Sequence, residues 1–110
     1  GADFTALTAY AGDDPEAARS ILRSFAEQTA GNCAELERAL GEGDAATVKT
    51  LAHKMLPIFT MLGAAGVAAT LRTAESWEGP LTDALRGEIG AAAENIRAIV
   101  AEAQKKVSLP

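Results

Sequence analysis

The chain has one cysteine, one histidine and few aromatic side chains. These scarcities bear on whether the chain can form a disulfide, a structural zinc site or a β-sheet. Cys33 is the only cysteine among 110 residues, so no disulfide can form within the chain. One cysteine and one histidine cannot supply the four ligands of a structural zinc site. Aromatic residues make up only 5% of the chain, whereas hydrophobic residues make up 48% and alanine is abundant. This composition is typical of closely packed helices rather than of a sheet.

Positive charge is scarce as well. The formal net charge is −5, and no basic stripe is present that could neutralise phosphates, so we expect no nucleic-acid partner. The same charge disfavours contact with an anionic membrane surface, and no apolar run approaches the roughly 20 residues of a membrane span. The length suits a single domain over residues 1–110 with a core of its own, and the lone cysteine fits a reducing compartment.

Apolar residues recur at steps of three and four along most of the chain, which predicts helices. The expected helices cover about 3–11, 15–41, 45–61, 64–77 and 81–107. The first of these segments would carry Phe4, Leu7 and Tyr10 on one side. The connections are short, so neighbouring helices should be antiparallel. The predicted fold is therefore all-α, an antiparallel up-down-up-down four-helix bundle with a short extra N-terminal helix.

Polar residues and glycines mark where these helices begin and end. Asp14 and Asp44 are placed to cap the second and third helices, and Pro15 suits a first helical turn. Gly43 can adopt left-handed backbone angles between them, and Gly63 marks the end of the third helix. The spacing of Gly41 and Gly43 does not make a phosphate-binding loop, because no strand precedes it and no Lys-Ser/Thr pair follows.

His53 lies on an amphipathic helix but away from its apolar face. On a helical wheel it is roughly 150° from the centre of the apolar stripe, so we expect the imidazole to point into water. On geometry alone an ordinary surface histidine explains this position equally well. The stripe itself consists of Val48, Leu51, Ala52, Met55, Phe59 and Leu62.

An exposed imidazole could act as a general base, a metal ligand or a phosphoryl acceptor. A general base needs a substrate pocket and a metal site needs further ligands, whereas a phosphoryl acceptor needs only reach, a nearby cation and a docking surface. Lys49 and Lys54 are the candidate cations. The candidate docking residues around His53, which could equally be a partly buried helix flank, are Leu56, Pro57, Thr60 and Met61.

The chain resembles a known family, the histidine-containing phosphotransfer (HPt) domains of bacterial multistep phosphorelays. The family core reads Ala-His-x-Leu-Lys-Gly followed by Leu-Gly-Ala, and the resemblance covers about residues 4–100. The matching residues are Ala52-His53-Lys54-Met55, Leu62-Gly63-Ala64, Asp14-Pro15, Phe25, Gly43-Asp44, Leu71 and Glu75.

The resemblance implies a four-helix bundle in which His53 is phosphorylated on a ring nitrogen. The phosphoryl group would pass between His53 and an aspartate of a response-regulator receiver domain. Such domains have no ATP site or kinase activity of their own and bind no cofactor, and Mg²⁺ is expected on the partner receiver. The implied location is the cytoplasm, either alone or as the cytoplasmic part of a membrane-bound hybrid sensor histidine kinase.

Two positions depart from the family pattern. The family usually has lysine three residues and glycine four residues after the histidine, where this chain has Leu56 and Pro57. Pro57 has no N–H for the carbonyl of His53 and its ring crowds that carbonyl, so we expect a local kink. These departures favour an alternative, a helical interaction module that keeps the fold but carries no phosphate. A third interpretation, a metal- or cofactor-binding bundle, lacks inward-facing ligands.

Overall fold

The chain folds almost entirely into helices, as its composition predicts. The computed structural model describes residues 2–108, of which 83% are helical and none lies in a strand. The molecule is elongated, with extents of 46 × 19 × 19 Å. Its elements are α1 (Thr5–Thr8), the 3-10 helix η1 (Ala9–Ala11), α2 (Pro15–Glu42), α3 (Ala45–Met61), α4 (Ala65–Glu75) and α5 (Asp83–Ser108).

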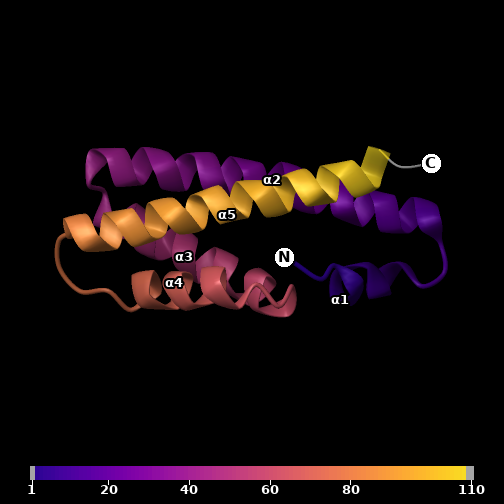
Figure 1. The fold of residues 1–110 in the computed structure, drawn as a ribbon, viewed down its shortest axis with the longest axis horizontal. Helices are drawn as coiled ribbons and strands as arrows, with labels where there is room; N and C mark the ends of the chain where they lie inside the picture. Colours follow the sequence, from indigo (N-terminus) through magenta and orange to yellow (C-terminus); the bar gives the residue numbers. More distant parts are fainter. Residues whose placement is uncertain (1, 109–110) are drawn as a thin grey trace.

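The two longest helices, α2 and α5, lie side by side along most of the molecule (Figure 1). Helix α2 also packs against α3, and α4 packs against both α3 and α5. Because α3 and α4 are shorter, they cover only part of the long pair, and α1 lies beyond their end against α2. This arrangement brings the outward-facing flanks of α3 and α4 next to each other.

The N-terminal segment is attached to the rest of the molecule at two points. The backbone N–H of Asp3 donates a hydrogen bond of 2.9 Å to the carbonyl of Leu62, at the end of α3. The ring of Phe4 meets that of Phe25 edge-on at 5.9 Å between centroids, and Phe25 meets Phe59 at 6.2 Å. Such edge-to-face pairs add about 0.5–1.5 kcal/mol beyond the burial of their area. The three rings thereby link the N-terminal segment, α2 and α3.

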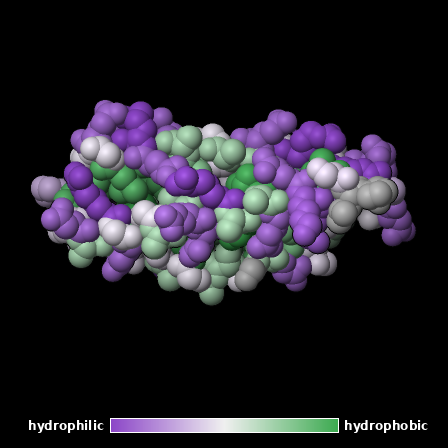
Figure 2. All heavy atoms as spheres, turned by 45° about the horizontal axis from the view of Figure 1, so that its top comes forward, coloured by the Kyte–Doolittle hydropathy of each residue, from purple (hydrophilic) through white to green (hydrophobic). Residues whose placement is uncertain are grey.

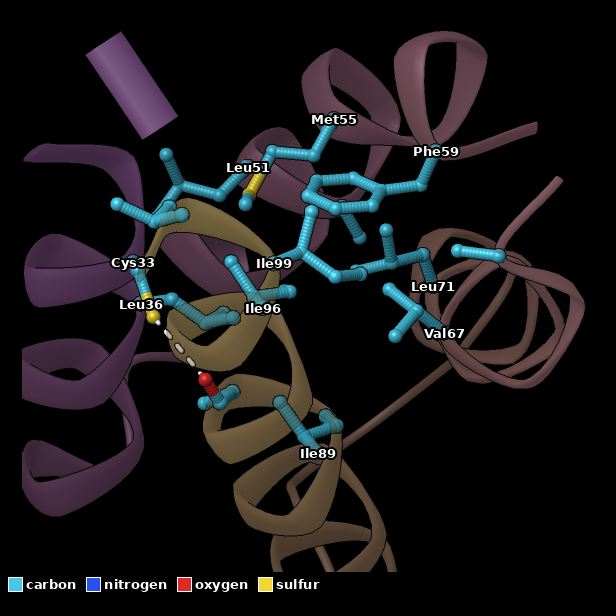
Figure 3. Close-up of a cluster of buried hydrophobic side chains, with 14 of the residues drawn as sticks. Cys33, Leu36, Leu51, Met55, Phe59, Val67, Leu71, Ile89, Ile96 and Ile99 are labelled. Carbon is cyan, nitrogen blue, oxygen red and sulfur yellow. Dashed lines mark hydrogen bonds between the residues drawn. The ribbon is translucent and has the colours of Figure 1, made fainter. Parts of the chain in front are cut away.

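The core is drawn from all four long helices (Figure 3). Cys33 belongs to it, because the side chain is 1% exposed and its Sγ lies 3.5 Å from the carbonyl oxygen of Ala93. Burial raises the pKa of the Cys33 thiol, so it remains protonated and behaves as a small apolar side chain. The largest of the fully buried side chains are Phe59, Leu36, Leu62, Leu71, Ile89, Ile96, Val48 and Cys33.

The surface contrasts with this core. In the face shown in Figure 2, polar side chains cover much of the molecule, and apolar atoms show mainly between them. Among the described residues, Tyr10 is the one large hydrophobic side chain that is strongly exposed, at 82%. No helix among residues 2–108 is both long enough and apolar enough to cross a membrane.

Side-chain caps begin the second and third of the predicted helices, as expected. Asp14 Oδ1 accepts hydrogen bonds from the backbone N–H groups of Glu16 at 3.0 Å and Ala17 at 3.3 Å. Asp44 accepts from the backbone N–H of Thr47 at 3.1 Å and from its hydroxyl at 2.6 Å. These bonds to Thr47 lower the pKa of Asp44, so the cap stays ionised at neutral pH.

Two glycines turn the chain at the ends of α2 and α3. Gly43 and Gly63 have φ values of 68° and 69°, in the left-handed region that glycine adopts without strain. The turn at Gly63 is short, so α4 starts at Ala65 directly beside the end of α3. The short turn therefore helps to fix which residues of α4 lie opposite which residues of α3.

Three of the predicted helices differ from the observed ones by two residues at one end. The first segment divides into α1 and η1, and Tyr10 is exposed instead of lying beside Phe4. Helix α4 ends at Glu75 rather than at 77, which leaves Trp77 in a loop where its indole N–H donates to the carbonyl of Pro80 at 3.0 Å. Helix α5 begins at Asp83 rather than at 81, because Thr82 Oγ1 accepts from the backbone N–H of Leu85.

Candidate functional site

The only histidine projects from the outward face of α3. Its side chain is 77% exposed, whereas Ala52 and Met55 beside it on the helix are 0% and 2% exposed. The expectation that His53 points away from the core is therefore confirmed. The imidazole is available to a reagent that approaches the surface of α3.

A carboxylate from the neighbouring helix holds one side of the imidazole. His53 Nδ1 makes a short contact with Glu75 Oε1, at the end of α4. In a neutral imidazole one ring nitrogen carries the proton and the other a lone pair. A carboxylate only accepts hydrogen bonds, so Glu75 selects the tautomer with the proton on Nδ1. Nε2 is then left with its lone pair, which is the form that a nucleophile requires.

Lys49 lies one turn before His53 and reaches the same neighbouring segment. Its Nζ donates to the backbone carbonyl of Trp77 at 3.3 Å and lies 3.4 Å from Glu78 Oε1. The pair is exposed, with side-chain exposures of 46% and 90%, and pairs of this kind contribute at most about 1 kcal/mol. Lys49 is therefore engaged with the end of α4 and the loop after it.

Lys54, the second candidate cation, is exposed and belongs to the opposite flank of α3. Successive residues of a helix are about 100° apart, so Lys54 follows His53 around the helix on the side away from Lys49. Within residues 2–108 its ammonium group has no ion-pair partner. The two lysines that the sequence suggests thus lie on different sides of the imidazole.

The four candidate docking residues divide into two kinds. Pro57 and Thr60 are exposed, whereas Leu56 and Met61 are half-buried, and Leu56 packs against the core. Thr60 Oγ1 donates to the carbonyl of Leu56 at 2.9 Å, so its hydroxyl is turned back to the helix. The part of the α3 surface that follows His53 toward the C-terminal end of the helix, with Pro57 and Thr60 exposed, is uncharged.

Helix α3 continues through Pro57 to Met61, so the expected distortion does not end the helix. Pro57 still cannot donate to the carbonyl of His53, four residues earlier, because it has no N–H. The backbone of the candidate nucleophile therefore has one acceptor that the helix does not satisfy at this position.

Other chemistries find less support around His53. Residues 2–108 contain no group of three or more His, Cys, Asp or Glu side chains arranged to hold a metal ion. A groove of about 440 Å³ lies between the α3–α4 turn and α5, and one of about 180 Å³ lies beside Lys49 and Trp77. His53 lines neither groove, and its side chain, 77% exposed, lies on the surface of α3.

Sequence reasoning placed Glu75 in a motif but did not identify it as the partner of His53. Trp77 and Glu78 were not identified as partners of Lys49 either. These contacts join residues more than 20 positions apart, and they depend on how α4 lies along α3. The acidic residues near the end of the fourth predicted helix were the available signal.

Removal of the Glu75 carboxylate should release the imidazole tautomer. In Glu75→Ala we expect the fraction of His53 with the proton on Nδ1 to fall, because no acceptor then favours it, as measured by long-range ¹H–¹⁵N NMR of the neutral ring. Glu78→Ala is the matched control, since it removes a carboxylate from the same region that contacts Lys49 instead. Equal tautomer populations in the wild type and Glu75→Ala would contradict the assignment.

Replacement of Pro57 should stabilise the domain. Pro57→Ala restores an N–H opposite the His53 carbonyl, and we expect a gain of about 2 kcal/mol in the free energy of unfolding in urea. This figure allows for the loss of about 0.4–1 kcal/mol from a more flexible unfolded chain. Pro80→Ala, in the loop before α5, should show only that small loss. A destabilised Pro57→Ala would mean that the helix depends on the proline ring.

Comparison of the chain with protein-family models, with curated proteins and with solved structures finds no match. The function is therefore argued from the residues and their geometry.

Proposed function

We propose that this domain is a phosphoryl carrier of a phosphorelay, in which His53 accepts a phosphoryl group from a receiver-domain aspartate and passes it to another receiver. The supporting observation is the exposed imidazole whose Nδ1 is held by Glu75. The proposal includes the HPt fold, an antiparallel four-helix bundle with an extra N-terminal helix. It places the domain in the cytoplasm, alone or as part of a hybrid sensor kinase.

The chemistry follows from the tautomer that Glu75 selects. The Nε2 lone pair of His53 attacks the phosphorus of the receiver's aspartyl phosphate, a P–N bond forms, and the P–O bond to the aspartate breaks. The aspartate leaves as a carboxylate, and Nδ1 keeps its proton, so the ring becomes a phosphoimidazolium. In the reverse direction a second aspartate attacks phosphorus and the neutral imidazole leaves with the P–N electron pair. No proton has to be transferred in either step.

Glu75 has a second role in this scheme. The phosphoimidazolium carries a positive charge, and the carboxylate that contacts Nδ1 stabilises it. An imidazole that keeps its Nδ1 proton is also a neutral leaving group, whereas a deprotonated ring would have to leave as an anion. Glu75 therefore supports both acceptance and onward transfer.

The surface around His53 is suited to a protein partner. In the proposal Leu56, Pro57, Thr60 and Met61 contact the receiver domain, and Lys49 and Lys54 supply positive charge near the phosphoryl group. The acyl phosphate and the Mg²⁺ belong to the receiver. The open surface supports this division, since His53 lines neither of the grooves beside α3 and α4.

A second candidate function is a helical interaction module that keeps the fold and carries no phosphate. Leu56 and Pro57 favour it, because they stand where HPt domains usually have lysine and glycine. The engagement of Lys49 with Glu78 and the Trp77 carbonyl also favours it, since that lysine is not free in the structure. The two candidates differ in whether His53 takes up phosphate.

Transfer from phosphorylated receivers separates the two functions. We expect the wild-type domain to gain an acid-labile, base-stable label when it is incubated with Mg²⁺ and a panel of phosphorylated receiver domains, because only His53 Nε2 is a suitable acceptor. His53→Gln should gain none, while its far-UV circular dichroism stays unchanged. If no receiver in the panel labels the wild type, including receivers encoded beside it, the interaction module is favoured.

A further inference from the structure

A phosphoryl group on His53 would enter a region that already carries negative charge. Glu75 contacts the ring itself, and Glu78 lies one turn further along. Lys49, the cation that contacts this segment, is paired with Glu78 and the Trp77 carbonyl. Like charges so close together oppose the addition of a phosphoryl dianion unless another cation is within reach. The charges around the site therefore call for a cation besides Lys49.

The register between α3 and α4 indicates where that cation lies. His53 on α3 meets Glu75 on α4, and Lys49, one turn earlier on α3, meets Glu78, three residues later in the chain. The two segments therefore run in opposite directions past each other. One turn after His53 on α3, at Leu56, the facing position on α4 is one turn before Glu75. The residues there are Leu71 and Arg72.

Of these two residues, only Arg72 reaches the surface. Leu71 is 0% exposed and belongs to the core, whereas Arg72 is exposed. Residues three apart on a helix lie on neighbouring positions of one face, with Cβ atoms about 5–6 Å apart, so Arg72 emerges beside Glu75. The helical wheel of α4 places both on the same side of its buried stripe. That side faces α3, because it is the side from which Glu75 contacts His53.

The guanidinium of Arg72 makes no ion pair within residues 2–108, whereas Arg19, Arg38 and Arg97 each pair with a glutamate. The residue opposite it, Leu56, is apolar and cannot satisfy it. Arginine presents a planar set of donors that matches phosphate oxygens two at a time, and an exposed lysine offers only a point charge.

We propose that Arg72 is the cation that binds the phosphoryl group on His53, an inference that rests on the proposed phosphocarrier function. Its guanidinium donates to two phosphoryl oxygens while Glu75 holds Nδ1 on the other side of the ring. The phosphoryl group is then bound between α3 and α4, and Lys49 keeps its contacts with Glu78. In this site α3 supplies the phosphoryl acceptor, and α4 supplies both of its polar partners.

A small phosphoryl donor tests this inference without any receiver. Phosphoramidate, which reacts in its N-protonated form, phosphorylates exposed imidazoles: Nε2 attacks phosphorus, a P–N bond to the ring forms, the P–N bond to the –NH₃⁺ group breaks, and ammonia leaves with that electron pair. We expect Arg72→Gln to be labelled about two- to fivefold more slowly than the wild type, which corresponds to the loss of one exposed ion pair in the transition state. Arg72→Lys should recover part of the rate, because lysine restores the positive charge but not the planar pair of N–H donors.

The matched control is Arg23→Gln, which removes an exposed arginine near the C-terminal end of α5, and it should be labelled at the wild-type rate. The direct readout is the Arg72 Nε–H signal in ¹H–¹⁵N NMR, which should shift and exchange more slowly with water once His53 is phosphorylated. The signal of Arg23 should not move. A merely structural role of Arg72 would not produce this change.

The outcomes distinguish the inference from the function on which it rests. Labelling of Arg72→Gln at the wild-type rate, or an Arg72 signal that does not respond to phosphorylation, would overturn the contact even if receivers transfer phosphate to His53. If Arg72→Gln slows labelling by phosphoramidate and the Arg72 Nε–H signal shifts on phosphorylation, the contact between Arg72 and the phosphoryl group is supported, even if no receiver transfers phosphate to His53. A wild-type His53 that phosphoramidate fails to label would overturn both.

Discussion

The packing of α3 against α4 is the constraint on which the candidate site depends. Phe59, Leu62 and Leu71 are each 0% exposed, so the two helices share a buried face. The turn at Gly63 is short and left-handed, which leaves little freedom in how far α4 is displaced along α3. Glu75 meets His53 as a consequence of this register, and Lys49 meets Glu78 one turn away. A change in the buried face would therefore alter the chemistry of the imidazole at the surface.

Much of the architecture could be predicted because it depends on local periodicity and caps. The bounds of α3 agree with the expected 45–61, and Asp14 and Asp44 cap as the sequence indicates. The outward position of His53 also follows from one helical wheel. The N-terminal segment was less regular than expected, because only Phe4 of its three large side chains is buried and Tyr10 remains in water.

The arrangement around His53 could not be obtained in the same way. A helical wheel gives the direction of a side chain from its own axis, but it does not say which residue of the next helix lies opposite. Glu75 is separated from His53 by 22 positions, and it becomes a neighbour only through the register between α3 and α4. The pairing of Lys49 with Glu78 likewise depends on α4 ending at Glu75, two residues earlier than the apolar pattern indicates.

The central claim concerns one atom, Nε2 of His53, as the phosphoryl acceptor with the proton retained on Nδ1. The most direct measurement is NMR of the ¹⁵N-labelled ring and of ³¹P after transfer from a phosphorylated receiver. The account predicts that phosphorus couples to Nε2 and that Nδ1 still carries its proton at neutral pH. Phosphorus bound to Nδ1, or a His53 ring unchanged after exposure to phosphorylated receivers, would contradict it.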